Sequence, residues 1–198
     1  FARHIVKPDL LHSHVIEVRE RMTAEGEVLT PLDEAHARTA LTAAFAEGRR
    51  AAAIACLHGW AYPAHEQRLA EIARKIGFTQ VSVSSEISGL IKFVPRADTT
   101  VADAYLSPVL RAYVGGFARA FEGQDGVKLL FMQSNGGLAH ADRFRGRDAV
   151  LSGPAGGVVG MAAAAERAGF GQALGFDMGG TSTDVSHYAG VFERTNES

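Results

Sequence analysis

The chain carries near its end the stretch Phe176-Asp177-Met178-Gly179-Gly180-Thr181-Ser182-Thr183-Asp184-Val185-Ser186, which decides the interpretation of the fold. Two adjacent glycines and three hydroxyl residues lie between two carboxylates, with strand-like residues on both sides. Glycines let a turn expose consecutive backbone N–H groups without a Cβ in the way, which forms a concavity suited to an anion. We interpret the stretch as a strand-turn-strand unit that holds phosphate.

The two carboxylates extend this interpretation. Asp177 and Asp184 repel phosphate, so their use beside it is to hold Mg²⁺ or to orient a water molecule. No Lys follows the glycines, which excludes a Walker A loop, and the glycine spacing does not give the dinucleotide-binding fingerprint. The alternative is a tight hairpin that only needs glycine at positive φ. The carboxylates and hydroxyls in register favour nucleotide chemistry.

A glycine-rich segment precedes this stretch. Residues 151–160 read Leu-Ser-Gly-Pro-Ala-Gly-Gly-Val-Val-Gly and lead into alanines, which predicts a helix that ends near Gly169. Pro154 suits the first helical turn. The glycines recur at spacings of three and four, so one helix face lacks side chains. This favours close approach by another helix, with ordinary small-residue packing as the alternative.

Strand and helix patterns alternate along the rest of the chain, which predicts the α/β class. We expect a hairpin within 15–29, a helix from residue 32 to a stop at Gly48, helices at 64–76 and 100–121, strands at 51–57, 81–84, 127–133 and 149–151, and, after a strand at 183–187, a third strand beyond Gly190. A fresh β unit begins after the helix that ends near Gly169. We therefore place a domain boundary between residues 169 and 170.

Composition narrows the functional classes. The 198 residues include 20 Lys+Arg against 22 Asp+Glu, and this balance excludes the basic profile of a nucleic-acid-binding protein. No run of about 18 apolar residues is present, so we expect no membrane span. The single cysteine and the lack of a secretion signal favour the cytoplasm. Phe1 is not a natural initiator, and we expect a segment of a longer protein.

Isolated polar residues give weaker signals. Cys56 lies in an apolar run, which favours a buried, inert thiol over a nucleophile. Asn135, Gly136 and Gly137 follow a predicted strand and either line a cleft or form a turn with left-handed residues. Metal ligation is one interpretation of His12, His14, His58, His65 and Glu66, and carboxylate binding is one interpretation of Arg143, Arg145 and Arg147. We favour surface histidines and a solvent-exposed arginine face.

The glycine-rich helix followed by the strand-turn-strand unit resembles, in its order, the interdomain helix followed by the second phosphate loop in the actin-like ATPase superfamily. The amino-acid sequences of the motifs resemble the hydantoinase A/5-oxoprolinase family over nearly the whole chain. The resemblance rests on residues 130–138, 144–146, 150–160 and 175–186, and on Gly26-Glu27-Val28-Leu29-Thr30-Pro31-Leu32-Asp33, Pro63-Ala64-His65-Glu66-Gln67-Arg68, Ser84-Ser85-Glu86-Ile87, Val94-Pro95-Arg96 and Asp103-Ala104-Tyr105-Leu106. It implies a partial actin-like ATPase (ribonuclease H-like) fold that ends in the glycine-rich hairpin.

The resemblance also implies an activity. It points to ATP-dependent opening of 5-oxoproline or a hydantoin, with phosphorylation of the amide oxygen and release of ADP and phosphate. On this hypothesis Gly179, Gly180, Thr181 and Thr183 contact phosphate, while Asp177 and Asp184 hold Mg²⁺ or the attacking group. Residues 1–169 would end the first half of the ATPase and include the interdomain helix, and residues 170–198 would begin the second half with its phosphate loop.

Partners and rival functions follow from the same resemblance. We expect a small cyclic amide as substrate, the rest of the same polypeptide or a hydantoinase B-type subunit as protein partner, and an oligomer. No nucleic acid or membrane is expected. One alternative is the subunit of an ATP-dependent acetone-type carboxylase. The other is an actin-like nucleotide switch that controls a protein partner.

Overall fold

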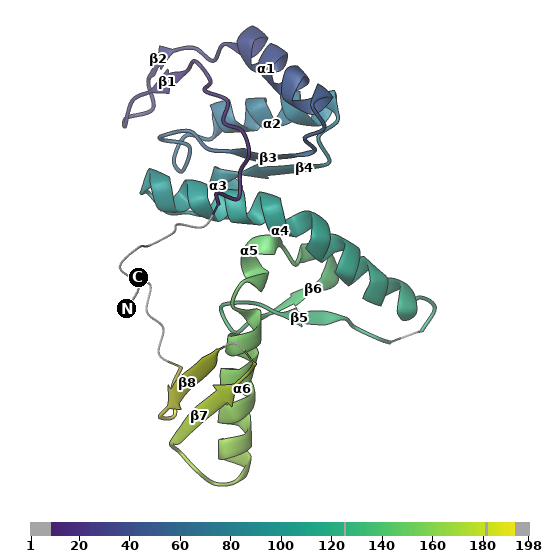
Figure 1. Ribbon diagram of the computed structural model, residues 1–198. Helices are drawn as coiled ribbons and strands as arrows, with labels where there is room; N and C mark the ends of the chain where they lie inside the picture. Colours follow the sequence, from purple (N-terminus) through teal and green to yellow (C-terminus); the bar gives the residue numbers. More distant parts are fainter. Residues whose placement is uncertain (1–8, 125, 181, 193–198) are drawn as a thin grey trace, which may run out of the picture. The chain divides into compact units, whose positions relative to one another are not determined.

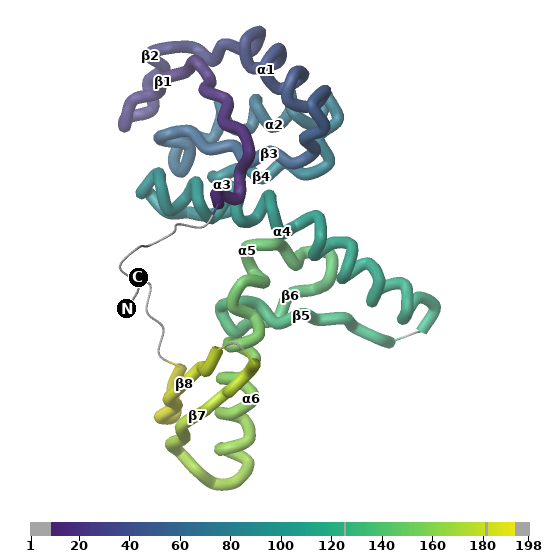
Figure 2. Tube along the Cα trace, in the orientation of Figure 1, coloured from purple at the N-terminus to yellow at the C-terminus, as the bar shows by residue number. Residues whose placement is uncertain are grey.

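The structure, a computed structural model, describes residues 9–124, 126–180 and 182–192 (Figures 1 and 2). The chain divides into two compact units, residues 1–111 and 112–198. The division falls within the long helix α4, Phe93–Ala120. Within the described ranges, no helix is both long and apolar enough to cross a membrane.

The first unit begins with a short antiparallel hairpin. Strands β1, Arg21–Met22, and β2, Val28–Thr30, pair across a turn in which Thr23 Oγ1 accepts from the Glu25 and Glu27 amides at 3.2 and 3.1 Å. Gly26 has φ of +93°, and a Cβ there would overlap the ring of Tyr62. The hairpin expected within residues 15–29 is therefore confirmed, with shorter strands than the pattern predicted.

A β-α-β unit follows the first helix. Helix α1, Glu34–Ala46, begins where the Asp33 side chain accepts from the His36 amide at 2.9 Å. Strand β3, Ala51–Ile54, and strand β4, Gln80–Val83, are parallel and are connected by helix α2, Ala64–Ile76. Gly77 ends α2 with φ of +119°, a left-handed conformation that glycine adopts readily. These elements confirm the expected helices and strands of this region.

Side-chain alternation on β4 explains the layers of the first unit. Val81 and Val83 contact two apolar clusters built with α1 and α2, which also contain Ile54, Leu69 and Phe78. Gln80 and Ser82 point the other way: Ser82 donates to Asp103 of α4 at 2.6 Å, and Gln80 donates to Ser82 at 2.7 Å. Figure 1 shows α1 and α2 on one side of this sheet and α4 on the other. The short helix α3, Ser84–Ile87, directly follows β4.

The second unit contains two antiparallel hairpins and the glycine-rich helix. Strands β5, Leu130–Met132, and β6, Leu138–His140, form the first hairpin, and β7, Ala173–Met178, and β8, Thr183–Tyr188, form the second. Between them lie the 3-10 turn η1, Ala141–Arg143, helix α5, Gly146–Ala149, and helix α6, Ser152–Arg167. The rings of Phe131 and Phe144 stack at 5.4 Å between centroids.

One expected strand is wrong. Residues 149–151 lie at the junction of α5 and α6, not in a ladder. The Asp148 amide donates within the turn to the Arg145 carbonyl at 3.0 Å, and the Leu151 amide donates to the Ser134 hydroxyl at 2.9 Å. Local and side-chain acceptors therefore use the backbone donors of this short apolar run. Residues 191–192 are not in a strand, and the rest of the expected third strand lies outside the described ranges.

Candidate functional site

The candidate site is built on the β7–β8 hairpin, where Asp177 lies directly opposite Asp184. Residues paired in this way project to the same face of an antiparallel ladder, about 5 Å apart at Cβ. Gly175 and Ser186, two residues further along, share that face. The two carboxylates predicted to act together are thus brought together by strand register.

This carboxylate pair fits a divalent cation. Like charges directly opposite each other destabilise a ladder, and a cation between them removes the repulsion. Both residues are exposed, and no ion pair to either carboxylate is found among the residues described. In the described part of the chain, no cluster of three or more His, Cys, Asp or Glu side chains could hold a metal. Two carboxylates suit Mg²⁺, which keeps several waters and takes further oxygens from phosphate.

The adjacent glycines are not explained by turn geometry. The Gly179 amide donates to the Ser182 carbonyl at 2.9 Å and closes the turn. Neither Gly179 nor Gly180 has a positive φ. A Cβ at Gly180 would meet nothing within 4 Å, and one at Gly179 would lie at an ordinary 3.7 Å from the Ser182 oxygen. The simple-hairpin alternative, which required glycine at positive φ, is therefore wrong for this pair, whereas close approach by a ligand remains a reason for it.

Helix α6 covers the carboxylate face of the hairpin. A Cβ at Gly157 would lie 3.6 Å from Asp177 Oδ2, and one at Gly175 would lie 3.4 Å from the side chain of Met161. The neighbouring Gly156 faces Met132 of β5, also at 3.6 Å. The glycine face of α6 therefore approaches strands, and the expected crossing by another helix is not found in the described part of the chain. Asp177 lies against the amino-terminal half of α6 as a result.

The loop after β5 also contacts α6. Asn135 Oδ1 accepts from the Gly137 amide at 2.7 Å, and Gly136 has φ of +79°, so the loop forms the left-handed turn that was one of its two interpretations. A Cβ at Gly136 would lie 3.6 Å from Val159 of α6. Loop 133–137 and Asp177 thus contact neighbouring turns of the same helix.

The two threonines predicted to contact phosphate are less well supported than the aspartates. Thr183 pairs with Met178 and so belongs to the opposite face of the hairpin, with exposed Phe176 and Val185. Its proposed phosphate contact depends on its position beside the turn and not on a face shared with the aspartates. Thr181 lies outside the described residues.

Structural roles are found for Cys56, His65 and Arg147, which the sequence also offered for other chemistry. Burial raises the pKa of the Cys56 thiol to about 12, with Glu20 and Glu66 adding to the rise, which supports the inert interpretation. His65 Nδ1 lies 2.7 Å from Glu20 Oε2. The Arg147 guanidinium lies 3.4 Å from the Asp148 carboxylate.

The sequence interpretation missed a buried polar network in the first unit. Glu66, fully buried, accepts from the Cys56 amide at 2.7 Å, the Ser85 amide at 2.9 Å and the Ser84 hydroxyl at 2.5 Å. Glu66 shares the helical stripe of Leu69, Ala70 and Ala73, all buried, and this position was the available signal. It holds together the segments that follow β3 and β4.

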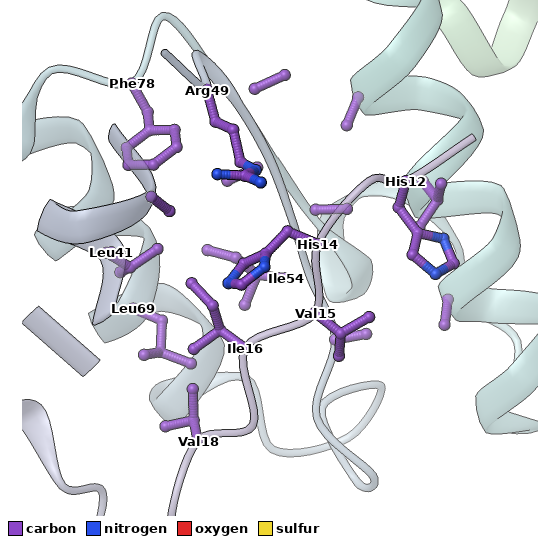
Figure 3. A pocket seen from close by; sticks show the side chains of 18 of the residues that line it. His12, His14, Val15, Ile16, Val18, Leu41, Arg49, Ile54, Leu69 and Phe78 are labelled. Carbon is purple, nitrogen blue, oxygen red and sulfur yellow. The ribbon is translucent and has the colours of Figure 1, made fainter. Parts of the chain in front are cut away.

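The first unit also contains an apolar cavity of about 630 Å³ (Figure 3). Ile16, Val18, Leu41, Ile54 and Leu69 are among its lining residues, and none of the predicted site residues lies there. The cavity is separate from the candidate site, which lies in the second unit.

Two solved enzymes share this fold. One is a nucleotide-free structure of acetone carboxylase, an enzyme of ATP-dependent acetone carboxylation. It matches 87% of the chain with a TM-score of 0.76 and 28% identity. The ATP-dependent caprolactamase from Pseudomonas jessenii matches 86% with a TM-score of 0.75 and 32% identity. The chain covers 25% of each. These similarities confirm the α/β class and a partial actin-like ATPase fold.

The sequence then assigns the family. Models described as Hydantoinase/oxoprolinase and Hydantoinase/oxoprolinase N-terminal region match residues 96–198 and 1–77, so the chain belongs to the hydantoinase/oxoprolinase family. It is 39% identical to the 5-oxoprolinase of Saccharomyces cerevisiae, over 95% of this chain and 17% of that protein. It is 32% identical to the acetophenone carboxylase gamma subunit of Aromatoleum aromaticum, over 87% of this chain and 24% of that protein.

Proposed function

We propose that this chain contributes one nucleotide-binding wall of an ATP-dependent cyclic amidase that opens 5-oxoproline or a closely related lactam. The observation that carries the proposal is the Asp177–Asp184 pair beside two glycines that neither backbone conformation nor packing requires. Membership of the hydantoinase/oxoprolinase family and the likeness to the yeast 5-oxoprolinase support the substrate class.

In this proposal the residues of the β7–β8 hairpin position the phosphates of ATP and neutralise their charge. The Gly179 amide closes the turn, so the Gly180 amide faces phosphate oxygens, and Gly179 leaves room for them because it has no side chain. Thr181 and Thr183 add hydroxyl donors. Asp177 and Asp184 would hold Mg²⁺ and its waters, and the bound ion would neutralise charge on the transferred phosphoryl group. Helix α6 lies against Asp177 at Gly157, on the carboxylate face of the hairpin. Coupling to ATP supplies the drive that hydrolysis of an unstrained lactam lacks, by making the amide carbon a better electrophile.

The proposal includes partners, location and domain organisation. The acetophenone carboxylase relative is named as a gamma subunit, which supports association with a hydantoinase B-type subunit or with a further part of the same polypeptide in an oligomer. A single cysteine supports a cytoplasmic location. We keep residues 1–169 as the end of the first ATPase half and 170–198 as the start of the second.

The test is ADP release by the full-length protein with and without 5-oxoproline. Wild-type protein should release ADP faster in the presence of 5-oxoproline, and Asp177→Ala should lower the stimulated rate by about a hundredfold or more because charge neutralisation at phosphate is lost. The circular dichroism spectrum of the variant should match wild type. Near-normal turnover by Asp177→Ala would remove the assigned role.

A second candidate rests on the likeness to acetone carboxylase, whose TM-score equals that of the lactamase within 0.01. A ketone carboxylase would release ADP in response to acetone with bicarbonate and would ignore 5-oxoproline. A nucleotide switch would turn over ATP without regard to either compound. The same ADP assay therefore separates the three functions.

A further inference from the structure

The amino end of α6 is held by a residue that is distant in sequence. Leu151 is the cap residue of α6, and no side chain of the helix's own first turn caps it. Its amide donates instead to the hydroxyl of Ser134, at 2.9 Å. The Ser134 hydroxyl in turn donates to the Asp148 carbonyl at 2.8 Å, and the Ser134 amide donates to the same carbonyl at 2.7 Å.

Ser134 therefore links the loop after β5 to the α5–α6 junction through three hydrogen bonds. Its hydroxyl accepts from a residue 17 positions away and donates to a residue 14 positions away, and Ser134 is half-buried. Loss of the hydroxyl would leave the Leu151 amide without this acceptor, at a helix end where unpaired donors already accumulate.

Helix α6 transmits this placement to the candidate site. Gly157, about 1.7 turns after Leu151, lies against Asp177, and Gly156 lies against Met132 at the end of β5. The distance of the β5 loop from Asp177 is thus set by α6, and Ser134 fixes α6 against that loop. A misplacement of about 1 Å is enough to cost a catalytic site about a hundredfold in rate.

We propose that Ser134 is a positioning residue for the nucleotide site: it locks loop 133–137 to the amino end of α6 and so sets the position of Asp177. The inference rests on the proposed function of the β7–β8 hairpin and adds a residue on a different element, which touches neither phosphate nor metal. Its role is mechanical and requires a hydroxyl, which threonine keeps.

The test compares Ser134→Ala, Ser134→Thr and Ser152→Ala in the full-length protein. Ser152 is the matched control, because its hydroxyl donates to the Ala149 carbonyl at 2.9 Å in the same junction but does not reach the β5 loop. We measure kcat/KM for ATP in the 5-oxoproline-stimulated reaction and the affinity for a non-hydrolysable ATP analogue with Mg²⁺. Ser134→Ala should lower both by about tenfold, Ser134→Thr should restore most of the loss, and Ser152→Ala should resemble wild type.

The outcomes separate the two proposals. The positioning role is overturned if Ser134→Ala has the same values as wild type, or if Ser152→Ala shows an equal loss. It is also overturned if Ser134→Thr fails to restore the loss. A wild-type protein that binds the analogue but ignores 5-oxoproline overturns the amidase proposal alone, and analogue affinity then decides the role of Ser134. A wild-type protein that does not bind the analogue overturns both.

Discussion

Arg96 uses all five of its N–H donors on the backbone and side chains of the first unit. Its guanidinium donates to the carbonyls of Cys56, Leu57, Leu90 and Ile91 at 2.6 to 3.0 Å, and its Nε donates to the Ser84 hydroxyl at 2.9 Å. Ser84 also donates to Glu66, so one buried carboxylate and one buried guanidinium share a hydroxyl. Satisfied donors offset the cost of placing these charges away from water.

We predict that Glu66→Ala destabilises the first unit by about 3–5 kcal/mol, because Arg96 would remain buried without the carboxylate of the network. Glu71→Ala, on the same helix, removes only an exposed partner of Arg68 and should cost about 1 kcal/mol or less. Urea unfolding followed by fluorescence of Trp60, the single tryptophan, reports on this unit. Equal midpoints for the two variants would contradict a structural role for the buried carboxylate.

At the scale of elements, two glycines of β7 and α6 differ in the space around them. Gly175 lies under the helix, where a Cβ would collide with the Ser186 hydroxyl and lie at 3.4 Å from Met161, a tight contact. Gly160 lies within α6 with nothing within 4 Å of its Cβ position. The first glycine permits close packing, whereas the second only reduces helix propensity in this chain.

Two alanine substitutions should therefore have opposite effects in residues 1–198. Gly175→Ala should destabilise the second unit by about 1–3 kcal/mol, as overpacking does. Gly160→Ala should stabilise it by about 0.5–1 kcal/mol through helix propensity. Thermal unfolding followed by circular dichroism measures both, and a stabilising Gly175→Ala would show that the helix does not pack on β7 as described.

At the scale of the whole molecule, the apolar cores are unevenly distributed. Both core clusters lie in the first unit, on α1, α2 and the β3–β4 sheet. The buried apolar side chains that the structure describes in the second unit are few: Val114, Phe144, Ala162 and Tyr188. One face of the β7–β8 hairpin exposes Leu174, Phe176, Met178 and Val185, each at least 66% accessible.

We predict that the two units unfold in separate transitions in residues 1–198, because stability follows buried apolar area. The second unit should unfold at the lower urea concentration. Hydrogen exchange of amides in α6 would report on it, and Trp60 fluorescence would report on the first unit. Coincident transitions by the two probes would contradict this order.

The sequence by itself determined the features that depend on neighbouring residues. The helix that begins after Pro63 and ends at Gly77, the β-α-β alternation, and the pairing of Asp177 with Asp184 all follow from local spacing, capping and a turn of known length. The expected strand at residues 149–151 was wrong because a hydroxyl 17 residues away takes the Leu151 amide, and no local pattern records that bond.

Only the tertiary structure decided which distant residues meet. It placed Gly157 against Asp177, Ser134 against the start of α6, and Glu66 beneath the segments after β3 and β4. It also placed Thr183 on the face away from the aspartates. Periodicity fixes the face on which a residue lies, whereas the partner on that face depends on how helices and strands pack, and that packing is set by many weak contacts between segments far apart in the chain.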